Sequence, residues 1–197
     1  SCDHGRKDET ADVLKDVESY INDKPDSALT VLQSICKETL SSKELKARHA
    51  LLLSQALDKN YIDLQSDSII APAVKYFEKT KDYESIFKSY YYHGRVLFNA
   101  DRNIEAMQVY LKAEELSEKV TDNFAIGLLC AQIGVLNSKY FNYAKAAEYY
   151  HKAKEYYRQA GKDTHVHLCD LDLGQAYYES GQKEKGTALY MDCLDWA

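Results

Sequence analysis

Three glycines, Gly94, Gly134 and Gly174, recur at intervals of 40 residues, each inside a stretch that otherwise has the pattern of an α-helix. A glycine in a helix interior costs about 1 kcal/mol relative to alanine. Its recurrence therefore indicates a place where another segment approaches the backbone closely. The fixed interval indicates a chain built from repeated structural units.

Other residue types keep the same interval. Counted from each glycine, a small residue recurs twelve positions on (Ala106, Ala146, Gly186), a tyrosine sixteen on (Tyr110, Tyr150, Tyr190), and a small residue again nineteen on (Ala113, Ala153, Cys193). Two antiparallel helices that pack closely around one large ring need this pattern. We therefore assign structural roles to these positions.

This pattern resembles the tetratricopeptide repeat (TPR), which has glycine at its eighth position, alanine at its twentieth and twenty-seventh, and an aromatic residue at its twenty-fourth. The resemblance is strongest over residues 83–197. It implies an all-α, right-handed superhelical solenoid of antiparallel helical hairpins. The period of about 40, against the usual 34, implies helices longer by most of a turn.

Upstream of residue 83 the match is looser. Ser54 takes the glycine position, and Ala73 and Phe77 follow after an insertion; Ala28 and Leu32 hold the corresponding places nearer the N-terminus. We predict a flexible tether over residues 1–9 and one solenoid over 10–197, with hairpins at about 10–38, 42–81, 83–120, 123–160 and 164–197. Ser41 and Glu44 predict a capping box that begins the second hairpin.

The charge distribution argues against nucleic acid as a partner. The chain has 25 Lys and Arg against 31 Asp and Glu, a net charge of −6, and the basic residues are interspersed among acidic ones. A nucleic-acid-binding domain usually has a basic patch or stripe. No apolar run is long enough to predict a transmembrane helix, which needs about 18 or more residues.

The five cysteines divide into two groups. Four of them, Cys36, Cys130, Cys169 and Cys193, lie where helices need small apolar residues, and we predict that they are reduced core residues. Cys2 lies in the polar segment "SCDHGRKDET", where two interpretations fit. It is either the lipid-attachment residue left after removal of a lipoprotein signal, or an incidental thiol.

The wider layout, a cysteine-led polar N-terminus followed by TPR-like hairpins, resembles the bacterial TPR lipoproteins. That resemblance implies a location at the cell envelope, with lipid on Cys2 as the only link to the membrane; without the lipid the protein would be soluble. Some members of that set continue into a membrane helix and a DNA-binding output domain, neither of which this sequence contains.

No recognisable motif groups residues for catalysis or for binding a cofactor. We therefore predict neither catalytic activity nor a bound cofactor. His165, His167 and Cys169 alternate, but residues two apart on a helix point in different directions and cannot share a metal ion. Asp170 and Asp172 are interpreted as carboxylates on a solvated helix face. Glu114 and Glu115 are interpreted in the same way.

In the TPR family the first helix of each hairpin lines a concave groove that binds a peptide, and the resemblance implies the same here. The corresponding positions are Lys88, Tyr91, Arg95, Phe98 and Asn99 in the third hairpin, Leu128, Ala131, Val135, Ser138 and Lys139 in the fourth, and Leu168, Leu171, Gln175, Tyr178 and Glu179 in the fifth. The mixture in the third hairpin is typical of recognition. An ordinary solvated helix face fits it equally well.

The last helical segment, "TALYMDCLDWA", is apolar on nearly every side, with Leu189, Met191, Cys193, Leu194 and Trp196. A terminal solenoid helix should present a polar outer face. Either the natural chain continues, or this end associates with a second copy.

Two functions follow as hypotheses. The first is a non-catalytic scaffold or adaptor at the cell envelope that binds a protein or peptide, so that substituting Tyr91 and Arg95 weakens capture of the partner. The second is a sensory module that passes a ligand-dependent change to an output domain outside this sequence.

Overall fold

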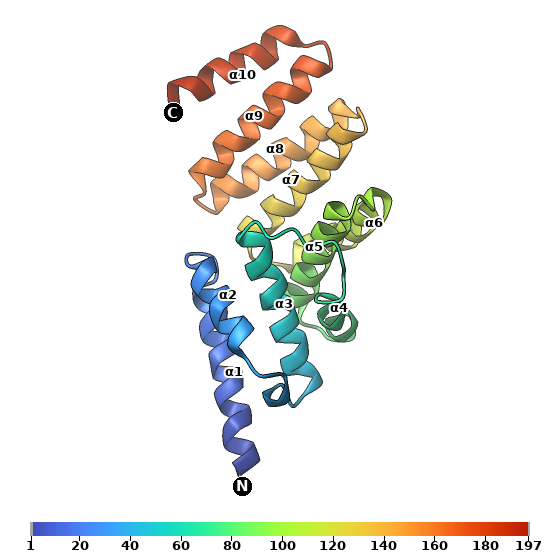
Figure 1. Ribbon diagram of the computed structural model, residues 1–197. Helices are drawn as coiled ribbons and strands as arrows, with labels where there is room; N and C mark the ends of the chain where they lie inside the picture. The colour runs from blue at the N-terminus through green and yellow to red at the C-terminus, as the bar shows by residue number, and fades with distance from the viewer. Residues whose placement is uncertain (1, 197) are drawn as a thin grey trace. The chain divides into compact units, whose positions relative to one another are not determined.

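The computed structural model describes the backbone of residues 2–196 and the side chains of residues 9–194. Within this range it contains helices and no strands (Figure 1). The α-helices are α1 (Cys2–Tyr20), α2 (Pro25–Ser34), α3 (Lys43–Lys59), α4 (Ala71–Phe77), α5 (Tyr83–Asn99), α6 (Asn103–Glu114), α7 (Asn123–Lys139), α8 (Tyr143–Gln159), α9 (Asp163–Glu179) and α10 (Lys183–Trp196); two short 3₁₀ helices are η1 (Lys37–Thr39) and η2 (Ser117–Lys119). The predicted all-α class is confirmed.

The chain forms two compact units, residues 1–109 and 110–197, and the boundary falls inside α6. In the second unit α7, α8, α9 and α10 follow one another as antiparallel neighbours, with α8 packed against both α7 and α9 and α10 packed against α9 (Figure 1). Each helix of 14 to 17 residues is connected to its hairpin partner by a short turn. Such pairs are the units of a helical repeat.

The close approach of the paired helices occurs at the recurrent glycines of the second unit. A Cβ atom added to Gly134 would lie 2.6 Å from the ring of Tyr150, and one added to Gly174 would lie 2.8 Å from the ring of Tyr190. Both distances are far below van der Waals contact. The tyrosine ring sixteen positions later therefore fills the space that a side chain would need, which accounts for the glycine in each helix.

The C-terminal ends of α3, α5, α7 and α9 repeat as well. The second residue after α3, α5, α7 and α9 is Tyr61, Asp101, Phe141 and Gly181 respectively, and all four have a positive φ. The next residue in each case donates its N–H to a carbonyl of the last helical turn. For example, the Asn142 N–H donates to the Asn137 carbonyl at 2.9 Å. This is the Schellman arrangement, in which a left-handed residue satisfies the last carbonyl groups of a helix.

In the first unit, α1, α2 and α3 share a core that includes Leu14, Val17, Ile21, Leu32 and Leu52. Helix α3 also packs against α4 and α5. An irregular segment of the chain joins α3 to the short helix α4, where the sequence predicts an insertion. This segment passes beside α5, as described below.

Three local predictions differ from the structure. The backbone of the predicted tether is helical from Cys2 onward, because α1 extends outward from its buried residues and each added helical residue costs little once a helix is nucleated. The side chain of Cys2 lies outside the described residues.

Ser42, not Ser41, caps α3 by accepting a hydrogen bond from the Leu45 N–H at 3.0 Å, because α3 begins one residue later than predicted. Cys36 is exposed, because it lies in the turn after α2 and not in a helix.

Candidate functional site

The predicted groove residues of α5 take part in contacts within the first unit. Tyr91 is only 5% exposed, and its ring packs edge-on against Tyr92 with centroids 4.9 Å apart. Burial raises the pKa of the Tyr91 phenol well above its usual value. Arg95 Nε donates to Asp58 Oδ1 of α3 at 2.8 Å. Asn99 Nδ2 donates to Asp63 Oδ1 at 3.1 Å in the segment after α3.

These contacts leave little space for a ligand beside α5. The cavity lined by Asp58, Arg95 and Asn99 has a volume of about 10 Å³, which is about the space of one water molecule. Lys88 and Phe98 are partly exposed. A role for α5 in binding remains a prediction, and the structure gives Arg95 and Asn99 a second role in holding α5 against α3 and the segment after it.

The candidates of α7 are mostly covered. Leu128 and Ala131 are partly buried, and Val135 packs against a core cluster that includes Tyr150 and Leu173. The Ser138 hydroxyl lies 3.3 Å from the Tyr150 hydroxyl. Lys139 is exposed. Helices α8 and α9 therefore occupy much of the surface that α7 would offer.

The candidates of α9 form a continuous exposed face. Leu168, Leu171, Gln175, Tyr178 and Glu179 are all exposed, and Leu168 is 51%, Leu171 41% and Tyr178 43% accessible. Leu168, Leu171, Gln175 and Tyr178 are spaced three or four residues apart, which places them on one side of the helix, and Glu179 follows Tyr178. Exposed leucines with a tyrosine beside polar side chains are typical of a surface that binds another protein.

Leu168 and Leu171 also line a cleft of about 390 Å³ between α9 and α10. The other residues of this α9–α10 cleft are Thr164, His167, Tyr190, Cys193 and Leu194. Leu194 is 70% exposed, and Met191, on the same helix, is 58% exposed. The cleft therefore presents mainly apolar side chains to its surroundings.

In the preceding hairpin, α7–α8, the residues equivalent to those of the α9–α10 cleft contact the next helix. Tyr190 and Leu194 hold the positions of Tyr150 and Lys154, 40 residues earlier. Tyr150 belongs to the core cluster that α8 forms with α9, and Lys154 forms an ion pair with Asp170 of α9. The face that a following helix covers on α7–α8 is thus the face that lies exposed on α9–α10.

The carboxylates of α9 differ from the sequence-based interpretation. Asp170 is 9% exposed, and its ion pair with Lys154 connects α9 to α8. Burial raises the pKa of Asp172 to about 6. The interpretation of this pair as a solvated face is therefore wrong, because packing buries the Asp170 side chain and partly removes the Asp172 carboxyl from water.

Glu114, which was interpreted in the same way, accepts hydrogen bonds from Tyr149 at 2.9 Å and from Lys152 at 3.2 Å. Glu115 is exposed.

Burial also raises the pKa values of Cys130 and Cys169 to about 12, so both stay as thiols at neutral pH. Among the described residues no group of three or more His, Cys, Asp or Glu is placed to hold a metal ion. The described helices include none that is long and apolar enough to span a membrane.

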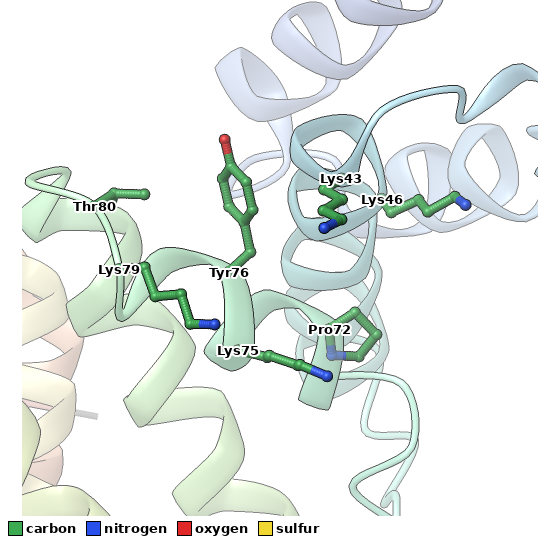
Figure 2. A pocket seen from close by; sticks show the side chains of 7 residues that line it. All are labelled: Lys43, Lys46, Pro72, Lys75, Tyr76, Lys79 and Thr80. Carbon is green, nitrogen blue, oxygen red and sulfur yellow. The ribbon is translucent and has the colours of Figure 1, made fainter.

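A second concave site lies in the first unit and was not identified from the sequence. Four lysines and Tyr76 line a cleft of about 550 Å³ between the start of α3 and α4, together with Pro72 and Thr80 (Figure 2). Lys43 and Lys46 come from α3, and Lys75 and Lys79 from α4 and the turn after it. We call this the basic cleft. The lysine spacings of three and four residues are visible in the sequence, but the pairing of the two helices that brings them together is not.

Comparison with known proteins identifies the fold. No protein-family model matches the chain, and no curated protein sequence matches it. Several solved structures do. A signal transduction ATPase with numerous domains (STAND) that has a tetratricopeptide repeat sensor, from Pyrococcus horikoshii, aligns with a TM-score of 0.73 and 19% identity over 96% of this chain, which spans 30% of that protein.

Two further structures match along nearly their whole length. The TPR-like repeats of a putative kinesin light chain from Podospora anserina align with a TM-score of 0.65 and 15% identity, over 95% of this chain and 94% of that one. The MamA protein aligns with a TM-score of 0.60 and 17% identity, over 95% of this chain and 91% of that one. The fold of this chain is therefore that of an all-α, TPR-like helical repeat protein.

Proposed function

We propose that this protein is a non-catalytic scaffold or adaptor that binds a protein segment in the α9–α10 cleft. The observation that supports this is the exposed apolar face of α9 and α10, which repeats the face that α9 covers on α7–α8. A TPR-like fold by itself implies no particular ligand, so the proposal depends on this surface.

The best-fitting ligand is an amphipathic helix. In the preceding hairpin the equivalent face is covered by a helix, and exposed leucines spaced three to four residues apart fit the apolar stripe of such a helix. Burial of both leucines by the ligand would contribute about 25 cal/mol for each Å² of apolar surface removed from water, before the cost of association.

The test is affinity capture from the native membrane and soluble fractions with the wild-type protein and with a Leu168→Gln/Leu171→Gln variant. We expect partners that the wild-type protein retains to be lost from the variant, with binding weakened about tenfold or more once a partner is isolated. Leu111→Gln is the matched control, since Leu111 is 42% exposed on α6 and lies outside the cleft. A partner that the double variant and the control retain equally would disprove the proposal.

A second copy of the protein is one alternative occupant of this face, and a segment of the natural chain after residue 197 is the other. Sedimentation of the wild-type protein over a range of concentrations distinguishes the two, because a second copy in the cleft makes the oligomeric state depend on concentration and on both leucines. A dimer that Leu168→Gln/Leu171→Gln dissociates would identify the cleft as an interface between copies.

A second candidate function is a sensory module within a larger regulator. The similarity to the TPR sensor of the STAND protein, which is longer than this chain, favours it. In that case ligand binding in the cleft would change the activity of an attached output domain. A reading frame that continues past residue 197 into such a domain would support this alternative, and a frame without one would oppose it.

We further propose attachment to the bacterial cell envelope by lipid on Cys2, an inference that rests on the "SC" pair and the polar residues after it. Intact mass measurement of the protein from its native membrane tests it. A mass without acyl chains would disprove the proposal.

A further inference from the structure

We propose that the basic cleft of the first unit binds a short acidic peptide segment. The cleft is lined by Lys43, Lys46, Lys75 and Lys79, with Pro72, Tyr76 and Thr80 as its uncharged walls, and no carboxylate lines it (Figure 2). It lies apart from the predicted groove positions. This inference is therefore independent of the α9–α10 cleft, and each can fail without the other.

The four ammonium groups are available to a ligand. None of these lysines forms an ion pair with another described residue. The glutamates next to them in sequence are engaged elsewhere, since Glu44 accepts a hydrogen bond from Arg48 at 3.2 Å and Glu78 accepts one from Tyr90 at 3.1 Å. Four lysines that line one cleft, in a chain of net charge −6, give the cleft a local positive potential that an anion would neutralise.

The helices hold the lysines in two pairs. Lys43 and Lys46 are three residues apart on α3 and lie on one face of it, while Lys75 of α4 and Lys79 of the turn after α4 line the same cleft. Helices α3 and α4 pack against each other, which fixes the pairs on the two sides of one cleft. Like charges held together in this way repel each other, and a bound anion would relieve that repulsion.

The uncharged walls indicate that the ligand has an apolar part as well. The Tyr76 ring packs edge-on against the buried ring of Phe77 with centroids 5.3 Å apart, so its position is supported by the core. The volume of about 550 Å³ is in the range of ligand pockets. An acidic segment that carries an aliphatic or aromatic side chain could place that side chain against Tyr76 and Pro72 and its carboxylates against the lysines.

Peptide carboxylates fit this cleft better than a nucleic acid does. A nucleic acid needs a basic track along its backbone and usually aromatic residues on which bases stack. Here the cations are confined to one cleft, and the chain as a whole carries more Asp and Glu than Lys and Arg. A long polyanion would meet that negative charge outside the cleft, and a short acidic segment would not.

The test measures binding of a short fluorescein-labelled peptide, rich in glutamate with one leucine, to the full chain by fluorescence anisotropy. We expect the wild-type protein to bind it, the peptide with glutamine in place of glutamate to bind at least about tenfold more weakly, and affinity to fall as salt rises to about 0.5 M. Lys75→Gln/Lys79→Gln should weaken binding about tenfold or more.

Lys24→Gln/Lys37→Gln is the matched control, because it removes the same charge from exposed positions of the first unit outside the cleft. Circular dichroism verifies that all variants keep their helices. Equal affinity for the glutamate and glutamine peptides, or equal losses in the two double variants, would overturn the proposal. So would binding of anionic lipid vesicles or of a single-stranded oligonucleotide, but not of the peptide, through Lys75 and Lys79.

Discussion

At the scale of single residues, two carboxyl groups on α9 differ in how the packing compensates for their burial. Asp170 is paired with Lys154 of α8, and both side chains are mostly buried. Asp172, two residues away, forms no ion pair with a described residue, and burial raises its pKa to about 6. Asp170 therefore has a cation that compensates for its burial, and Asp172 has no such partner among the described residues.

This difference predicts that Asp172→Asn stabilises the protein at neutral pH. The pKa of this carboxyl group rises from 3.8 in the unfolded chain to about 6 in the folded protein, so its ionisation lowers the free energy of unfolding. Its unfavourable contribution is absent below about pH 4, grows up to about pH 6 and is complete above about pH 7. We expect the variant to gain about 1–2 kcal/mol in free energy of unfolding at pH 8, measured by urea denaturation.

The control is Glu179→Gln, which removes one carboxylate from an exposed position of the same helix. We expect no comparable gain from it. If the Asp172→Asn gain is the same at pH 4 and at pH 8, burial of the ionised carboxylate is not its cause.

At the scale of elements, the helix ends are as regular as the helices. Tyr61, Asp101, Phe141 and Gly181 recur every 40 residues with positive φ, although only the last is a glycine. A left-handed conformation costs a residue with a side chain about 1–2 kcal/mol. Tyr61 is 94% and Phe141 80% exposed, so burial of these rings offsets little of that cost; Phe141 makes one edge-on contact, with the Tyr143 ring at 6.2 Å between centroids.

We therefore predict that Phe141→Gly stabilises the turn between α7 and α8. Relief of the left-handed strain should exceed the added entropy of the unfolded chain and give a net gain of about 0.5–1 kcal/mol in free energy of unfolding. Thermal and urea unfolding of the purified variant measure the gain.

The neighbouring substitution Tyr140→Gly serves as the comparison, because Tyr140 is also exposed but has a φ of −102°. It should destabilise the protein, since glycine there adds flexibility and relieves no strain. Destabilisation of similar size by both substitutions would show that the Phe141 ring contributes more than its backbone strain costs.

At the scale of the whole molecule, the two proposed binding surfaces differ in chemistry. The α9–α10 cleft is apolar, and the basic cleft between α3 and α4 gathers four lysines in a chain of net charge −6. They lie in different compact units. Binding at the first should depend weakly on salt and binding at the second strongly, so salt dependence separates the two in one set of measurements.

The amino-acid sequence by itself determined the fold class, through the interval between its small and aromatic residues. Gly134 with Tyr150 and Gly174 with Tyr190 could be paired from spacing alone, because a close contact between two helices excludes side chains at fixed positions. The helical identity of residues 83–196 follows from the same periodicity. Both are local or repeating properties, and a single sequence displays them.

Only the tertiary structure decided which faces of those helices are covered. The predicted groove positions are equivalent places of the repeat in α5, α7 and α9, yet Tyr91 is buried, Val135 packs against the α8–α9 core, and Leu168 is exposed. Likewise Lys43 and Lys75 are far apart in sequence and line one cleft because α3 packs against α4. Exposure and charge clustering depend on which neighbours cover each face, so they follow from packing between elements and not from the period within them.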